Sequence, residues 1–201
     1  MKRIYLLLIS VVLLSCHKKD QYEKCEEFKA TTRQYSYAIS NYQDFEGYGR
    51  FFKKVERDSV SGQSVVLPLK DGFWIGLNEL NNLCIPNNRI DFKNILPKIN
   101  DTINLYKIHN WGNLSSDTAY AVYRISDYDA GIDDYIIIPQ EKFRSWVVLQ
   151  SINSDTTLVS GTFQMGMSRL RPDRHKDDPL RPDTLYFVHG VFKAEFMKNK
   201  K

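Results

Sequence analysis

Apolar and polar residues alternate with a period of two in the last third of the chain. In LVSGTFQMGMS, over 158–168, every second position from Val159 to Met167 is apolar or glycine, and the positions between them are mostly polar. Side chains of a β-strand point alternately to opposite faces, so this pattern predicts a strand with one buried face. Gly161 interrupts its apolar row, which is typical of a bulge or of close contact with another backbone.

The stretch YFVHGVFKAEF, over 186–196, has the same period and its own interrupting glycine, Gly190. We expect these two strands to pair across the long connection between them. The predicted inward positions of the second strand are Tyr186, Val188, Gly190, Phe192, Ala194 and Phe196, and the predicted outward positions are His189, Lys193 and Glu195.

Short apolar runs separated by turn residues fill the middle of the chain. Asp71-Gly72, Asn87-Asn88, Gly112-Asn113 and Asn153-Ser154-Asp155 provide the turn chemistry. Many short strands at close spacing predict an all-β fold, a mainly antiparallel β-sandwich or a barrel-like sheet. The predicted strands cover 64–70, 73–77, 104–110, 118–125, 135–138, 146–152, 158–168 and 185–196.

The segment 22–45 is ambiguous. Its apolar positions fit a period of 3.6, which predicts an N-terminal helix that ends at Gly47 and Gly49, whereas Tyr35-Ser36-Tyr37 favours extended chain. We take the helix as the expectation. The resulting domain organisation is a leader over 1–15, an N-terminal tether with a possible helix over 16–60, and a β-sandwich domain over 61–201.

The leader consists of a basic start, a short apolar run and a cysteine. Lys2 and Arg3 precede an apolar run of about eleven residues, whereas a membrane-spanning helix needs about 20. This pattern is typical of a secretory signal. Leu13-Leu14-Ser15-Cys16 resembles the lipobox of bacterial lipoproteins, which predicts acylation of the Cys16 thiol; the alternative is an ordinary signal with a chance cysteine. Two or three acyl chains hold a protein durably on a membrane.

The predicted location is therefore the bacterial outer membrane, with the body facing the periplasm or the cell surface. A lysine followed by several acidic residues after the lipid site would resemble a surface-export signal. Here only one acid follows Lys19 before Gln21, so the sequence does not decide between the two sides. Without Lys2 and Arg3, the 28 basic residues of the full chain become 26, against 24 acidic residues. This small excess, without a basic stripe that carries aromatic residues, does not predict a nucleic-acid partner.

The C-terminal third also resembles a family. WVVLQSINSDTTLVSGTFQMGMS and LYFVHGVFKAEF are similar to the C-terminal half of uncharacterised lipoproteins of Bacteroidota, which carry a V-S-G-T-F strand and a final strand with G-x-F. Trp146–Phe163 and His189–Phe196, roughly a quarter of the chain, carry the resemblance. It implies a lipid-anchored β-sandwich and no particular activity. His189 departs from the pattern, as does the length of the loop before it.

Cys25 and Cys84 remain once Cys16 is assigned to the lipid. An exported protein can form disulfides, so one bridge that ties the N-terminal segment to the body is possible, and two free thiols are the alternative. The sequence contains no Cys-x-x-Cys motif and no Cys/His cluster with zinc spacing, so a structural metal is not expected.

One acidic segment, DYDAGIDDY, is a candidate calcium site. Asp127, Asp129, Asp133 and Asp134 surround Gly131, and Ca²⁺ takes six to eight oxygen ligands. The spacing does not match an EF-hand loop, because Gly131 falls at position 5 and Ile138 at position 12. A polar hairpin turn is the preferred interpretation, and calcium is the only cofactor considered.

Four residues are candidates for ligand binding: His109 and Trp111 in H-N-W-G-N, and Arg174 and His175 in the loop SRLRPDRHKDDPLRPDT. Loops carried by a rigid scaffold often bind ligands. In the second loop, Leu-Arg-Pro-Asp occurs at 170–173 and again at 180–183, and a solvated hairpin loop is the alternative. Trp74 and Trp146 lie inside apolar runs and are expected in the core.

No catalytic signature is present: the sequence lacks G-x-S-x-G, H-E-x-x-H, a P-loop and a dinucleotide fingerprint. The first hypothesis is a non-catalytic binding or accessory module, tethered to the envelope, that recognises a glycan, a peptide or an envelope protein. The second is an envelope-associated hydrolase acting on a glycan or another polymer. A structural lipoprotein that assembles with its neighbours is a third possibility. A pocket gathering His109 or His175 with two carboxylates would favour the enzyme.

Overall fold

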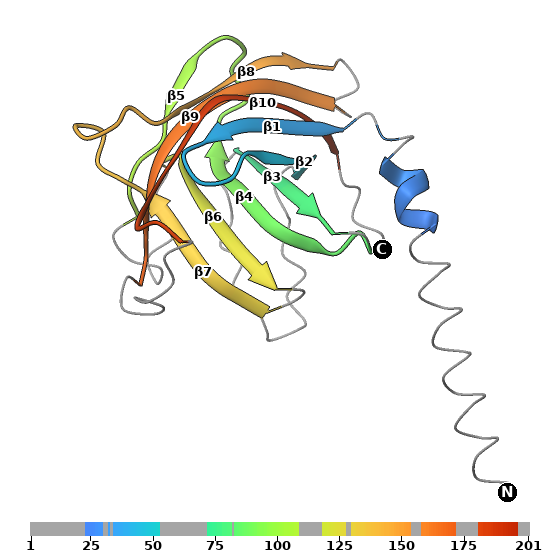
Figure 1. The fold of residues 1–201 in the computed structure, drawn as a ribbon. Helices are drawn as coiled ribbons and strands as arrows, with labels where there is room; N and C mark the ends of the chain where they lie inside the picture. The colour runs from blue at the N-terminus through green and yellow to red at the C-terminus, as the bar shows by residue number, and fades with distance from the viewer. Residues whose placement is uncertain are drawn as a thin grey trace, which may run out of the picture.

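The computed structural model contains one short helix and ten β-strands (Figure 1). It describes residues 23–29, 32, 34–52, 72–81, 83–108, 118–127, 130–153, 158–171 and 181–196. The helix covers 23–29. The strands are β1 (Tyr35–Ser40), β2 (Phe45–Phe52), β3 (Phe73–Leu80), β4 (Pro86–Ile95), β5 (Thr102–Asn104), β6 (Tyr120–Asp127), β7 (Ala130–Ile137), β8 (Trp146–Ile152), β9 (Leu158–Arg169) and β10 (Thr184–Phe196).

The strands form one sheet that closes on itself. Its order is β1-β10-β2-β3-β4-β6-β7-β9-β8-β5, and further pairings join β1 to β2 and β10 to β9. Eight strands therefore make a barrel, and β8 and β5 extend the sheet beyond it. β8 pairs with the first half of β9 and β7 with its last three residues, so the sheet forks along β9. The β10–β2 pairing is parallel and the other strand pairings are antiparallel. The predicted all-β, mainly antiparallel, barrel-like fold is confirmed.

Aromatic rings fill the middle of the barrel. Phe92, Phe163 and Phe192 are at most 1% exposed and form one group, with ring centroids 5.1 Å apart for Phe92–Phe163 and 6.4 Å for Phe163–Phe192. Phe45 and Phe187 form a second group with Tyr123. Each ring buries a large apolar area, so these groups supply much of the apolar burial of the core.

The predicted pairing of the last two strands is confirmed, with β9 and β10 antiparallel over ten residue pairs. All five predicted inward positions of β9 are buried. In β10 the alternation is right for Gly190, Phe192 and Ala194 and wrong for Tyr186 and Val188, which face outward while Leu185 and Phe187 are buried.

The cause is a register shift between Phe187 and Gly190, where His189 has a φ of 53°. The extra residue of such a bulge reverses the faces on its N-terminal side. A Cβ at Gly190 would collide with the Phe163 ring, and a Cβ at Gly161 would collide with the carbonyl oxygen of Val148. The predicted close approach of another backbone is therefore confirmed for Gly161, whereas Gly190 lies at the bulge and makes room for an aromatic side chain.

The N-terminal helix expected over 22–45 is wrong for most of its length. Only 23–29 is helical, and β1 occupies Tyr35–Ser40 with an alternating burial pattern. The extended conformation favoured by Tyr35 and Tyr37 is formed instead of a helix, because β1 pairs with both β10 and β2. Since β1 and β2 belong to the barrel sheet, the folded unit begins before residue 61, the predicted domain start.

Other predicted elements differ in detail. Asn87 and Asn88 belong to β4 rather than to a turn, and β4 and β2 were not predicted as strands. Of the described residues 104–108 of the predicted strand 104–110, only Asn104 is in a strand, at the end of β5. The predicted strand 64–70 lies outside the described residues.

Candidate functional site

The predicted lipidation site and all four predicted binding residues lie outside the described part of the chain. They are the lipidation site Cys16 and the predicted binding residues His109, Trp111, Arg174 and His175. The pocket that would favour an enzyme, built on His109 or His175, falls on the same residues.

The candidate calcium site is partly described. Asp133 and Asp134 are neighbours on β7 and face opposite sides of the strand: Asp133 is 5% exposed and 3.4 Å from Arg181 Nη1, whereas Asp134 is 2.8 Å from Arg124 Nε. These two carboxylates therefore do not converge on one ion, and each has an arginine as its partner. Asp129 and the side chain of Asp127 lie outside the described residues. In the described part of the chain, no three His, Cys, Asp or Glu side chains are grouped to hold a metal.

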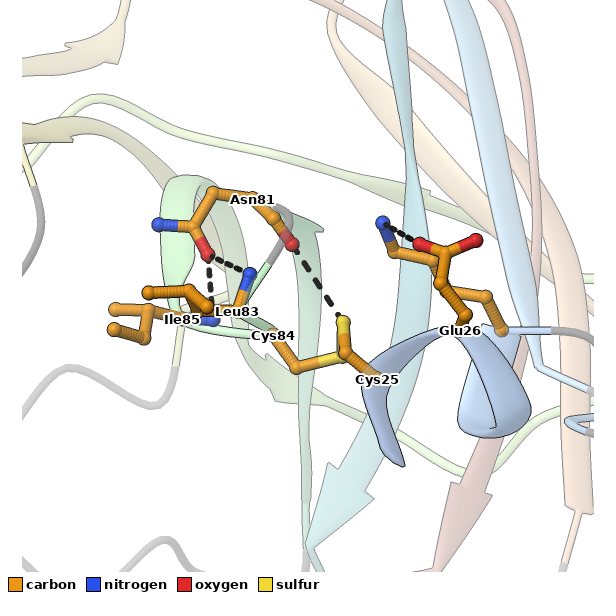
Figure 2. A network of polar contacts seen from close by, with 7 residues as sticks. Cys25, Glu26, Asn81, Leu83, Cys84 and Ile85 are labelled. Atoms are coloured by element: carbon orange, nitrogen blue, oxygen red, sulfur yellow. Dashed lines mark hydrogen bonds and ion pairs between the residues drawn. A yellow bond between two sulfur atoms is a disulfide. The ribbon is translucent and has the colours of Figure 1, made fainter. Parts of the chain in front are cut away.

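A disulfide joins Cys25 of the short helix to Cys84 in the β3–β4 turn (Figure 2). The turn is organised by Asn81, whose Oδ1 accepts hydrogen bonds from the backbone N–H groups of Leu83 and Ile85. The backbone carbonyl oxygen of Asn81 accepts a hydrogen bond from the backbone N–H of Cys84. The same oxygen lies 3.7 Å from Cys25 Sγ, which is a van der Waals contact because a disulfide sulfur carries no proton. Phe28 also packs on Tyr48 of β2, with ring centroids 5.4 Å apart. The helix is thus held on the barrel at two points.

The second Leu-Arg-Pro-Asp copy contributes to one end of the barrel interior. Tyr135 Oη donates to the carbonyl oxygen of Pro182 at 3.0 Å, and the Arg169 guanidinium, 2% exposed, donates to the carbonyl oxygen of Arg181. The N–H of Arg169 donates to the carbonyl oxygen of Asp183. Residues 181–183 therefore bind buried side chains, which neither a solvated loop nor a recognition loop predicts. Residues 172–180 of this loop lie outside the described residues.

The outer face of the barrel carries a group of charged side chains that the sequence did not nominate. We call Trp74 of β3, Arg89, Asp91 and Lys93 of β4, and Arg124 of β6 the cationic cluster. In β4, Ile90 and Phe92 are buried in the core, so the residues that alternate with them point outward.

Asp91 and Trp74 hold the cluster together. The Asp91 carboxylate accepts hydrogen bonds from Trp74 Nε1 at 2.8 Å and from Arg89 Nε at 2.7 Å. Lys93 Nζ lies 2.8 Å from the centroid of the Trp74 ring, and the Arg89 guanidinium carbon lies 5.1 Å from it. Gly76 of β3 lies beside the ion pair of Arg89 and Asp91. A Cβ added to Gly76 would come within 3.2 Å of Asp91 Oδ1 and 3.4 Å of Arg89 Nη2. The glycine leaves room for the ion pair to lie close to the sheet.

Arg89 and Arg124 are directly opposite each other on β4 and β6. Like charges in such a pair repel, because opposed side chains of an antiparallel sheet start about 4.5–5.5 Å apart. Each arginine meets an aspartate through Nε, Arg89 with Asp91 and Arg124 with Asp134. Among the described residues, the terminal amino groups of these two arginines donate no hydrogen bond. The two guanidinium groups lie on neighbouring strands, with side chains 30% and 46% exposed.

Lys93 is half-buried within this cluster. The pKa of its ammonium group is lowered to about 7, and burial is the main cause; Asp91 opposes the shift, and the charges of Arg89 and Arg124 contribute to it. The face of the Trp74 ring also favours the charged form. Tyr120 of β6 is directly opposite Lys93, and its hydroxyl has a pKa raised by burial. The charge of Lys93 therefore changes near neutral pH.

Replacing Lys93 with methionine is expected to stabilise the fold, most strongly at or below pH 7. Unfolded lysine binds a proton below about pH 10.5 and the folded one only below about 7, so wild-type stability rises with pH between these values. Below pH 7 both states are protonated and the cost of the buried charge is complete. Thermal unfolding at pH 6 and pH 9.5 measures this, with exposed Lys98→Met as the control. A gain for Lys93→Met that is equal at both pH values would contradict the assignment.

The sequence contains a signal for this cluster that was not used. Arg89-Ile90-Asp91-Phe92-Lys93 alternates strictly between charged and apolar residues, the pattern of a strand with a charged outer face. Because Asn87-Asn88 was interpreted as a turn, no strand was predicted over this segment. Trp74 and Trp146 were expected in the core. Both are instead half-buried and point outward, from β3 and β8.

Comparisons with known proteins place the chain in no family: no family model, no curated protein and no solved structure matches it. Within the described ranges, no helix has both the length and the apolar character that crossing a bilayer requires.

Proposed function

We propose that this protein is a lipid-anchored envelope lipoprotein whose barrel is a non-catalytic binding module for an anionic group. The leader and the Leu13–Cys16 motif support the anchor on Cys16, as does the resemblance to Bacteroidota lipoproteins. The Cys25–Cys84 disulfide supports an exported location, because disulfides persist in oxidising compartments and are rare in the cytosol. The location that follows is the outer membrane, on its periplasmic or its surface side.

The observation that carries the binding role is the opposed pair Arg89 and Arg124 beside Lys93. Three cations stand on this face with two carboxylates, those of Asp91 and Asp134, so the group has a net positive charge when Lys93 is protonated. Guanidinium forks match the geometry of carboxylate and phosphate oxygens. An anion between the two arginines would relieve their repulsion. The ligand class is therefore a carboxylate, phosphate or sulfate group on an envelope glycan, peptide or polymer.

The envelope-associated hydrolase remains the alternative class. Its candidate histidines, His109 and His175, lie outside the described residues, and no observation on the described ones favours it. The binding module is therefore the better-supported function.

Replacing both arginines with glutamine is expected to weaken anion binding. Each charge-assisted hydrogen bond contributes about 1.5–3 kcal/mol, so the double variant should bind at least about tenfold more weakly. Binding to immobilised polyphosphate and polygalacturonate, measured by surface plasmon resonance, tests this. Arg144→Ala, which removes an exposed arginine outside the cluster, is the matched control.

Wild-type binding should also strengthen from pH 8.5 to pH 6, because Lys93 becomes protonated over this range. Lys93→Met should remove that pH dependence and leave the arginine contribution in place. Equal binding by the double variant, Arg144→Ala and the wild type would contradict the proposal. Thermal unfolding of each variant shows whether a loss of binding is instead a loss of the fold.

A further inference from the structure

The outer face formed by β1 and β10 exposes an unusual number of large apolar side chains. Five of the eight large apolar side chains that are exposed among the described residues lie on it or at its rim: Tyr35, Tyr37, Ile39, Tyr42 and Tyr186, at 36–51% exposure. We call Tyr35, Tyr37 and Ile39 of β1 with Tyr186, Val188 and Val191 of β10 the tyrosine face. It lies on different strands from the cationic cluster.

Pairing makes this face continuous. Tyr37 is opposite Val191 and Ile39 is opposite Val188, so the apolar side chains of the two strands are neighbours. The bulge at His189 turns Tyr186 and Val188 outward; without it they would point into the core. A continuous exposed apolar face on a soluble domain marks an interaction surface more often than single exposed residues do.

The rim of the face carries charges of both signs. Asp44 and Glu46 lie on the β2 side, where Asp44 accepts a hydrogen bond from Tyr37 Oη at 3.3 Å, and Lys193 lies on the other side, opposite Tyr35. Tyrosine combines an apolar ring with a polar hydroxyl and is enriched at membrane–water interfaces. A tyrosine-rich face whose rim carries charges of both signs is suited to zwitterionic headgroups rather than to a strongly anionic partner.

The distance along the chain limits where the bilayer can be. Cys25 follows Cys16 by nine residues, which span at most about 32 Å even when fully extended. The disulfide fixes Cys25 to the barrel, and Figure 1 shows the helix close to the start of β1. Without the disulfide, the first barrel residue would be Tyr35, nineteen residues from Cys16, with a reach of about 65 Å. The bridge thus roughly halves the reach.

We propose that the tyrosine face rests on the headgroup region of the bilayer that carries the anchor and so orients the barrel on the membrane. This rests on the proposed acylation of Cys16. The lipid holds the chain near the bilayer, and the short disulfide-closed tether keeps the barrel there. The tyrosine face selects which side is turned to the lipid, and the cationic cluster on β3, β4 and β6 stays open to its ligand.

Hydroxyl-radical footprinting of the acylated full chain in phosphatidylethanolamine–phosphatidylcholine vesicles tests the orientation. Tyr106, 46% exposed and just after β5, is an internal control of similar exposure, four strands from β1 in the sheet. Residues of an interfacial face lie about 5–10 Å deep, so Tyr35 and Tyr37 should be oxidised about threefold more slowly than Tyr106. Equal rates overturn the proposal. Protection that grows with the protein-to-lipid ratio also overturns it, because a second copy then covers the face.

A paired variant checks the same face from the other strand. With both Tyr35 and Tyr37 replaced by serine, the protection of Tyr186 should be lost, whereas Tyr106→Ser should leave it unchanged. Because these side chains are exposed, the fold should tolerate the changes, and circular dichroism of the variants checks this.

Failure of the anchor has its own signature. Labelled palmitate that does not enter the wild-type chain, or a Cys16→Ala chain that still floats with vesicles as firmly as the wild type, contradicts the anchor rather than the face. Acylated chain that floats but shows equal oxidation of Tyr35, Tyr37 and Tyr106 contradicts the face alone.

Discussion

Truncating Phe163 to alanine is expected to lower the free energy of unfolding by about 3–5 kcal/mol, the largest effect of any single substitution considered. Phe163 is 1% exposed, its ring contacts those of Phe92 and Phe192, and it packs directly against the backbone of Gly190. Removal leaves a cavity that its neighbours cannot fill, because β9 is paired on both edges at this point. Urea unfolding followed by circular dichroism measures the change.

The control is Thr162→Ala, the neighbouring residue on the outward face of β9, which should change stability by less than about 1 kcal/mol. The result also bears on function. A barrel whose interior is filled by side chains must bind ligands on its outer surfaces or at its ends. If Phe163→Ala were neutral, the interior would be loosely packed in solution, and an internal ligand would become the better hypothesis.

Removing the disulfide is the second large effect. The bridge joins residues 59 positions apart, and closing a loop of that length in the unfolded chain contributes about 4 kcal/mol in the chain-entropy model. The Cys25→Ser/Cys84→Ser variant should therefore unfold at a clearly lower temperature than the wild type. Reductant should lower the wild-type Tm to about that of the variant and leave the variant unchanged.

A wild-type Tm that does not respond to reductant, with two thiols titrated after reduction, would contradict this stabilising role. The same variant tests the tether. It frees the helix covalently from the barrel and lengthens the maximal reach from Cys16 about twofold, so protection of the tyrosine face in vesicles should weaken even at temperatures where the barrel is folded.

The strands that were predicted well have one buried face and a plain period of two. β8 matches its predicted range, and β9 was predicted to within one residue, with its inward positions right. Local alternation suffices there because a strand with one face in the core must place its apolar residues on that face. β10 was located as well, but Tyr186 and Val188 were assigned to the wrong face, because the bulge at His189 depends on pairing with β9 and β1.

β1 and the cationic cluster were missed for a different reason. Over 22–45 the residues fit two periods, and only the long-range pairing of β1 with β10, more than 140 residues later in the chain, decides for a strand. Arg89 and Arg124 are 35 residues apart in sequence, and Trp74 and Lys93 are 19 apart. The alternation over 89–93 predicts one charged strand face, but nothing in the local sequence shows that Trp74 and Arg124 belong to the same face.

The all-β class, the location and pairing of the last two strands, and the presence of two cysteines that can form a disulfide could be inferred from local sequence alone. Alternation and residue chemistry are local properties, so they can be inferred without coordinates. The tertiary structure alone decided that Cys25 pairs with Cys84, that the second Leu-Arg-Pro-Asp copy closes around Arg169 and Tyr135, and that the cationic cluster and the tyrosine face exist. Each of these depends on barrel closure, which brings distant strands into register, and register is a property of the whole sheet.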